Sequence, residues 1–128
     1  MWKWVIKRVR VRRPSKKSRT AGLLQYGEAA RVLVHERLEY FNQFYHFTYH
    51  DVRIKSSVTR WGSCSSKGNL NFNYRIALIP PELADYIIVH ELCHLGEFNH
   101  SKKFWDLVAQ QIPNYQELRQ QLRNISFK

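Results

Sequence analysis

The spacing of apolar residues divides the chain into segments with different predicted structures. Residues 4–12 end in strict alternation, with Val9 and Val11 on one side and arginines on the other, which predicts a β-strand with a basic face. Residues 14–20 are polar and show no period, so we expect a loop there. From residue 23 to about 47, apolar residues return every three or four positions, as in a long amphipathic helix. The positions expected to be buried in this helix are Ala30, Leu33, Val34, Leu38, Phe41 and Tyr45.

The middle of the chain predicts two strands separated by a loop. Residues 52–56 alternate briefly, and residues 70–76 alternate more strongly between apolar and polar side chains. We expect these two strands to belong to one antiparallel sheet. The residues between them, 59–69, are small and polar with turn residues at Gly62 and Gly68, so we expect a loop that Trp61 anchors.

The last third of the chain predicts three helices. A helix should begin at Pro80-Pro81-Glu82, because proline is tolerated at the first helical position and an acid there complements the helix dipole. Its core-facing stripe would be Ala84, Ile88, Leu92 and Leu95, and Gly96 would end it. Ser101 would cap a second helix with Phe104, Trp105, Val108 and Ile112, and Asn114 would begin a third with Tyr115, Leu118 and Leu122 inward.

Size and composition favour one globular unit. The chain has 128 residues, of which 44% are hydrophobic and 14% aromatic, enough to build an apolar core. No apolar run is long enough to cross a bilayer, and lysine and arginine interrupt the apolar residues of the N-terminus, unlike in a signal peptide. Cys64 and Cys93 are too few for a disulfide framework. We therefore expect a cytoplasmic protein with reduced thiols and no membrane partner.

The positive charge is concentrated at the N-terminus. The first 19 residues hold nine of the 21 lysines and arginines and no acid, whereas the formal net charge of the chain is +11. Such a segment can bind phosphate backbones or simply keep the chain soluble. We therefore divide the chain into a basic strand and loop at residues 1–22 and a single domain at residues 23–128, with nucleic acid as a possible partner.

The strongest chemical pattern is the sequence His90-Glu91-Leu92-Cys93-His94, with His100 six residues further on. On a helix, His90 and His94 lie one turn apart on one face, with β-carbons about 6 Å apart, which allows them to share a metal ion. Three histidines leave a fourth zinc position for water, as in catalytic sites. We therefore predict a Zn²⁺ site at His90, His94 and His100, with Glu91 as the general base for hydrolysis of a peptide bond in a protein or peptide substrate.

Two other functions remain open at this stage. Cys64 could reach the metal from its loop and close a structural site, which would suit a basic module associated with nucleic acid. Alternatively, the site could hydrolyse an amide that is not a peptide, because nothing in the sequence identifies the acyl group. Cys93 points about 100° away from the midline of the two helical histidines, so we expect it to be buried.

Peptide hydrolysis also needs an oxyanion donor and a surface that holds the substrate. Candidates for the donor are Tyr74, Tyr86 and Arg60. The strand at residues 69–76, if it lies at the edge of the sheet, could hold an extended peptide through main-chain hydrogen bonds.

The chain resembles the YgjP-like zinc metallopeptidase domain, which is related to the SprT and WLM peptidases within the zincins. The resemblance covers about residues 36–123 and includes the segments 60–65, 69–73, 80–82, 90–94, 99–101 and 104–105. It implies a minimal zincin-like α+β fold in which a small, partly antiparallel sheet packs on a long N-terminal helix and on the helix of the histidine motif, followed by C-terminal helices. It also implies metal binding by His90, His94 and His100, and catalysis by Glu91. The spacing of His94 and His100 also occurs in metzincins, but Met1 is the only methionine, so a methionine turn is excluded.

Overall fold

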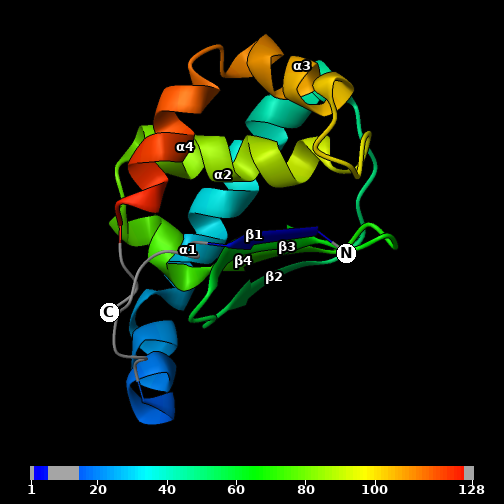
Figure 1. Ribbon diagram of the computed structural model, residues 1–128. Helices are drawn as coiled ribbons and strands as arrows, with labels where there is room; N and C mark the ends of the chain where they lie inside the picture. Colours follow the sequence, from blue (N-terminus) through cyan, green and yellow to red (C-terminus); the bar gives the residue numbers. More distant parts are fainter. Residues whose placement is uncertain (1, 6–14, 126–128) are drawn as a thin grey trace.

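The computed structural model describes residues 2–5 and 15–125, so most of the predicted basic strand lies outside the described residues. The described part is α+β, as expected: four strands form one sheet, and helices pack along it (Figure 1). The strands are β1 (Trp2–Val5), β2 (Val52–Lys55), β3 (Arg60–Cys64) and β4 (Leu70–Asn73). The helices are α1 (Lys16–Tyr45), the 3-10 helix η1 (Tyr74–Leu78), α2 (Pro81–Cys93), α3 (Lys102–Gln111) and α4 (Tyr115–Arg123).

The sheet corrects three predictions. Its order is β1-β3-β4-β2, and β3 occupies residues that were predicted to be a loop. Strands β2 and β4 are parallel instead of antiparallel, whereas β3 pairs antiparallel with both β1 and β4. The strand of residues 70–76 also ends early, because Tyr74 begins η1 and the side chain of Asn73 accepts a hydrogen bond from the Arg75 amide. Strand β4 is therefore an inner strand with neighbours on both sides.

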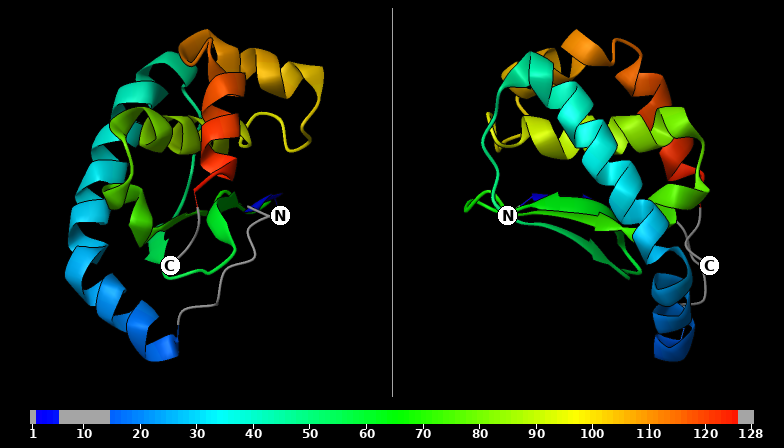
Figure 2. Two further views of the ribbon diagram at one scale, coloured as in Figure 1. Left: turned by 60° about the vertical axis from the view of Figure 1, so that its left-hand side comes forward. Right: turned by 180° about the vertical axis from the view of Figure 1, so that it is seen from behind.

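Helix α1 begins earlier than its apolar period predicts. The side chain of Ser15 accepts a hydrogen bond from the backbone amide of Ser18, and the helix starts at Lys16 inside the predicted loop. The proposed boundary between residues 22 and 23 thus falls within α1. The first turns of the helix project beyond the rest of the fold (Figure 2). Of its predicted inward positions, Ala30, Val34, Leu38 and Phe41 are buried, and Leu33 and Tyr45 are partly buried.

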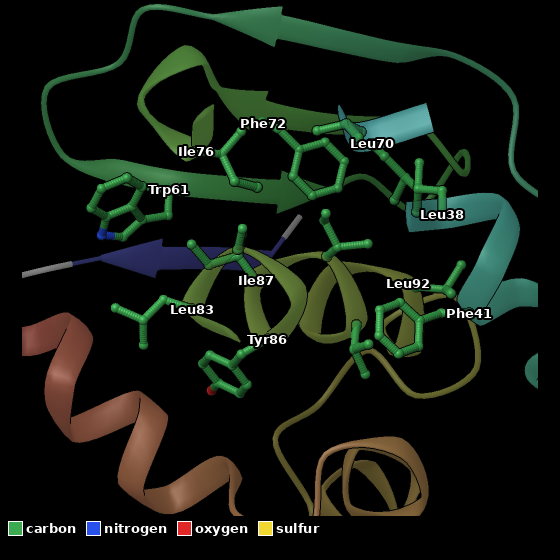
Figure 3. Packing of buried hydrophobic residues seen from close by; sticks show 14 of the residues in the cluster. Leu38, Phe41, Trp61, Leu70, Phe72, Ile76, Leu83, Tyr86, Ile87 and Leu92 are labelled. Atoms are coloured by element: carbon green, nitrogen blue, oxygen red, sulfur yellow. The ribbon is translucent and has the colours of Figure 1, made fainter. Parts of the chain in front are cut away.

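Helix α2 lies in the centre of the domain, between the sheet and the C-terminal helices (Figure 1). From Leu83 to His94 all its residues except Asp85 are buried, so the helix has no polar outer face. Figure 3 shows Phe72 of β4 and Ile87 of α2 in the layer between sheet and helix, with Tyr86 on the opposite side of α2. Proline at the first position of α2 agrees with the prediction. Because neighbouring elements cover α2, their packing restricts the directions of its side chains.

The C-terminal helices follow the sequence prediction closely. Ser101 caps α3 by accepting a hydrogen bond from the amide of Phe104, and Phe104 and Val108 are buried. Asn114 precedes α4, which buries Leu118 and Leu122, although the Asn114 side chain makes no capping hydrogen bond. Within the described residues, no helix is long and apolar enough to cross a membrane.

Candidate metal centre

Three histidine side chains converge at the C-terminal end of α2. The Nε2 atoms of His90 and His94 lie 3.2 Å apart, and that of His100 lies 3.2 Å and 3.0 Å from them. His90 belongs to the last turn of α2 and His94 is its C-cap, so the helix places the two side chains one turn apart. In the described part of the chain, His90, His94 and His100 form a group of closely spaced side chains that could hold a metal ion.

A short turn after α2 brings His100 back to the two helical histidines. The amides of Gly96 and Glu97 both donate to the carbonyl of Cys93, which ends the helix. A β-carbon on Gly96 would lie 2.7 Å from ring atoms of Phe47, so the glycine is required by close packing against the end of α1. Helix α2 ends at Cys93 with His94 as its C-cap, before the predicted stop at Gly96. Gly96 lies in the turn that follows, where its lack of a side chain leaves room for Phe47.

Glu91 lies on the side of α2 that faces β3. Its side chain is fully buried, and neither carboxylate oxygen has a hydrogen-bond partner among the described residues. Burial therefore raises the pKa of this carboxyl well above its usual range. A β-carbon on Gly62 of β3 would lie 3.0 Å from Cγ and 3.2 Å from Oε2 of Glu91. The absence of a side chain at Gly62 thus makes room for the carboxylate.

Burial keeps the histidine cluster neutral. It lowers the pKa of His94 and of His100 to about 4, and it lowers that of His90 well below the usual value. The mutual proximity of the histidines and the positive charge of Arg119 on α4 lower the pKa of His90 further. Neutral imidazole is the form that binds metal ions, so the site presents three ligand nitrogens at physiological pH.

Two contacts to the Nδ1 atoms orient the imidazoles of His90 and His94. Nδ1 of His94 lies 3.0 Å from the backbone carbonyl oxygen of Glu97, and Nδ1 of His90 lies 3.3 Å from the hydroxyl of Tyr86. Each imidazole therefore has its Nδ1 engaged and its Nε2 directed towards the centre of the cluster. Tyr86 was predicted only as a candidate oxyanion donor, although its position four residues before His90 on the same helix is a signal for this contact.

Aromatic side chains of α3 and α4 form one wall of the cluster. The Phe104 ring stacks on His94 with centroids 4.3 Å apart, and the Trp105 ring stacks on His100 at 5.6 Å. Tyr115 stacks on the Trp105 ring at 4.8 Å, and the guanidinium of Arg119 lies 5.1 Å from the centre of the same ring. The sequence places Phe104 and Trp105 in one predicted helix and Tyr115 on the inward side of the next, and only the folded chain shows that these rings lie against the histidines.

The cysteines lie outside the metal group. Cys64 and Cys93 are both buried and free, and burial raises the pKa of each thiol to about 12. A protonated thiol is a poor zinc ligand, because the thiolate is the form that binds. The predicted burial of Cys93 is confirmed, and nothing in the described geometry supports a metal site closed by Cys64.

The other candidate residues occupy different positions. The ring of Tyr74 stacks on Tyr26 of α1, and the hydroxyl of Tyr86 is directed at His90, so neither is placed to stabilise an oxyanion. Arg60 lines an open pocket of about 270 Å³ beside the sheet, together with Lys55 and Asn71. Strand β4 was predicted to hold substrate at an exposed edge, and this is wrong because β3 and β2 pair with both of its sides.

Comparison with known proteins agrees with this geometry. The description "YgjP-like, metallopeptidase domain" matches residues 3–125. Among solved structures, the metallopeptidase zymogen of Pyrococcus abyssi abylysin is similar with a TM-score of 0.64 and 25% identity, covering 70% of this chain and 90% of that one. The zymogen of Methanocaldococcus jannaschii jannalysin shares the fold, with a TM-score of 0.57, 24% identity and coverage of 73% and 92%. No curated protein matches. The chain therefore belongs to the YgjP-like metallopeptidase domain family and is a zinc-dependent peptidase.

Proposed function

We propose that His90, His94 and His100 hold the zinc ion through their Nε2 atoms and that Glu91 is the general base for peptide hydrolysis. The observation that supports this proposal is the triangle of Nε2 atoms, 3.0–3.2 Å apart. Zinc–nitrogen bonds of 2.0–2.1 Å in a tetrahedral site place ligand nitrogens about 3.3 Å apart. The spacing of the three nitrogens thus fits a zinc ion, with one position left for water or substrate.

The role proposed for Glu91 follows from its burial. When bound, zinc lowers the pKa of a coordinated water and polarises the scissile carbonyl. The Glu91 carboxylate, buried beside His90 and without a hydrogen-bond partner among the described residues, is available to accept a proton from the attacking water. It can then donate that proton to the nitrogen of the leaving amine. Gly62 keeps the space for this carboxylate open on the side of β3.

The substitution Glu91→Gln tests this assignment. It should lower kcat for peptide cleavage by about 10²–10⁴-fold while the protein still binds one equivalent of zinc. The matched control is the variant Glu82→Gln, which changes an exposed residue at the start of the same helix. This variant should cleave the peptide like the wild type. Cleavage that persists in Glu91→Gln would contradict the role of Glu91. Zinc binding that survives in His100→Ala with unchanged affinity would contradict the ligand set.

We also propose that an extended peptide substrate pairs with the edge of β3 and that β1 occupies this edge in the free protein. Strand β3 carries Gly62 against Glu91, so its outer edge is the part of the sheet nearest the proposed base. Strand β1 pairs antiparallel there, with Trp2 opposite Cys64 and Lys3 opposite Ser63. A peptide added to this edge would compete with β1 for the same backbone groups. The similar structures of abylysin and jannalysin are described as zymogens, which supports a latent form here.

Displacement of β1 tests this competition. Lys3→Pro removes one backbone donor from β1 and should raise kcat/KM for an extended peptide, whereas Lys3→Ala should leave it close to the wild-type value. Equal or lower activity of the proline variant, in protein that still binds zinc, would contradict a substrate site at the edge of β3.

A further proposal concerns nucleic acid and location. Lys16 and Lys17 are exposed on the first turn of α1, where positive charge is unfavourable for the helix dipole, and anion binding would offset that cost. We propose a cytoplasmic protein, on the support of two free buried cysteines, whose basic segment contacts phosphate backbones. Affinity for DNA that does not fall with rising salt, or no affinity at all, would contradict this contact.

A further inference from the structure

We infer that Tyr86 is a positioning residue that holds the imidazole of His90 in the orientation and tautomer required for zinc binding. The inference rests on the proposed ligand set and extends it to a residue that coordinates no metal itself. Tyr86 lies four residues before His90, so the two side chains are neighbours on successive turns of α2. The side chains of Tyr86, His90 and His94 thus follow one another along a single stripe of the helix.

The geometry of the contact is specific. The hydroxyl oxygen of Tyr86 lies 3.3 Å from Nδ1 of His90, and the two rings meet edge to face with centroids 5.8 Å apart and an interplanar angle of 75°. Tyr86 is fully buried on the side of α2 that faces away from the sheet (Figure 3). Nδ1 of His90 therefore meets a hydroxyl oxygen in an environment that contains little water.

The chemistry of imidazole explains the need for this oxygen. A neutral histidine that gives its Nε2 lone pair to zinc carries its proton on Nδ1, and a buried N–H requires an acceptor. For His94 the acceptor is the carbonyl oxygen of Glu97, supplied by the turn after α2. For His90 the hydroxyl oxygen of Tyr86 lies 3.3 Å from Nδ1. The hydroxyl of Tyr86 therefore supplies the acceptor that the backbone supplies for His94.

The hydroxyl of Tyr86 is more than packing alone requires. Helix α4 packs on α2 and buries Leu118 and Leu122. Phenylalanine would fill the same volume as Tyr86 if packing were the only role of this residue. The hydroxyl adds the contact with Nδ1 of His90, which phenylalanine cannot make.

Substitution of Tyr86 by phenylalanine tests the inference in the full chain. Zinc affinity, measured by competition with a chromophoric chelator, should fall by about 10–100-fold in Tyr86→Phe. Tyr45→Phe is the matched control, because the Tyr45 hydroxyl donates to the carbonyl of Leu107 and does not contact the histidine cluster. The control should keep the zinc affinity of the wild type, and thermal unfolding of the metal-free proteins shows whether both variants fold.

A spectroscopic measurement separates positioning from a general loss of stability. In zinc-bound wild type, the Nδ1 proton of His90 should exchange slowly and appear in a proton–nitrogen spectrum of the imidazole rings. In Tyr86→Phe this signal should broaden or shift, while that of His94 stays unchanged. Equal zinc affinities of wild type and Tyr86→Phe, or an unchanged His90 signal, would overturn the inference. Failure of the wild type itself to bind zinc would instead refute the proposed function.

Discussion

The middle and the C-terminal end of helix α2 are equally buried, but burial has opposite energetic consequences in them. In the middle, Ile87 and Ile88 belong to the same buried apolar cluster as Phe72, and each Å² of apolar surface removed from water contributes about 25 cal/mol to stability. At the C-terminal end, Glu91 and the histidines are buried as well, and there burial raises the pKa of the carboxyl and lowers those of the imidazoles. The apolar cluster stabilises the fold without a ligand, whereas the group of Glu91 and the histidines is stabilised by the metal ion proposed to bind there.

This difference separates structural from functional burial. A carboxylate without a hydrogen-bond partner costs free energy when it is buried, and either a proton or a ligand that supplies the missing interactions offsets this cost. A metal-binding site of this kind therefore depends on the apolar core that surrounds it, and substitutions should affect the two regions differently.

The largest effect on stability should come from a change in the apolar layer between the sheet and α2. Phe72→Ala removes a ring that is 1% exposed between β4 and α2, and should lower the free energy of unfolding by about 3–5 kcal/mol. Val32→Ala, at an exposed position of α1, is the control and should change it by less than about 0.5 kcal/mol. Denaturant titration of the metal-free proteins measures both values. A loss below about 1 kcal/mol for Phe72→Ala would show that this layer is not the main source of stability.

The next largest effect on stability should come from zinc binding at the histidine cluster. Zinc at a concentration 100 times its dissociation constant should stabilise the folded protein by about 2.7 kcal/mol, because it binds the histidine cluster only in the native state. The stabilisation should disappear with a chelator, and peptide cleavage should disappear with it. Thermal unfolding at several zinc concentrations gives the measurement. An unfolding temperature independent of zinc would mean that the three histidines do not bind it in the folded chain.

A smaller effect on stability is expected at Gly62, where the sheet meets Glu91 of α2. Gly62→Ala introduces a methyl group 3.0 Å from both the Asn71 carbonyl oxygen and Cγ of Glu91, and should cost about 1–3 kcal/mol of stability. Because the methyl group displaces Glu91, peptide cleavage should fall more steeply than zinc affinity. Ser63→Ala, the next residue along β3, is the control. If Gly62→Ala keeps wild-type kcat, then β3 does not set the position of the carboxylate.

The smallest effect is the dependence of stability on pH in the metal-free protein. The pKa of His94 and of His100 is about 4 in the folded protein, against an ordinary value of 6.5. Between these values the unfolded chain binds more protons than the native one, so the free energy of unfolding should fall as pH is lowered from about 6.5 to 4. The substitution His100→Gln should flatten part of this slope. A stability that does not change through this window would contradict neutral, buried histidines.

The sequence predicted the helices of the C-terminal half better than the strands. The starts of α2 and α3 follow from Pro81 and Ser101, and the metal group follows from histidine spacing on a helix, all of which are local signals. Strand β3 was missed because Gly62 and Ser63 are typical of turns. In the folded protein the glycine is required by the neighbouring Glu91, which is distant in sequence.

The amino-acid sequence by itself determined which residues could carry the chemistry, because four-residue spacing on a helix fixes the relative direction of His90 and His94. Only the tertiary structure decided how these residues are held. The parallel pairing of β2 with β4, the strand β1 at the edge of β3, and the contact of Tyr86 with His90 all depend on which distant segments pack together. Such choices arise from burial of apolar surface across the whole chain, and no short stretch of sequence contains them.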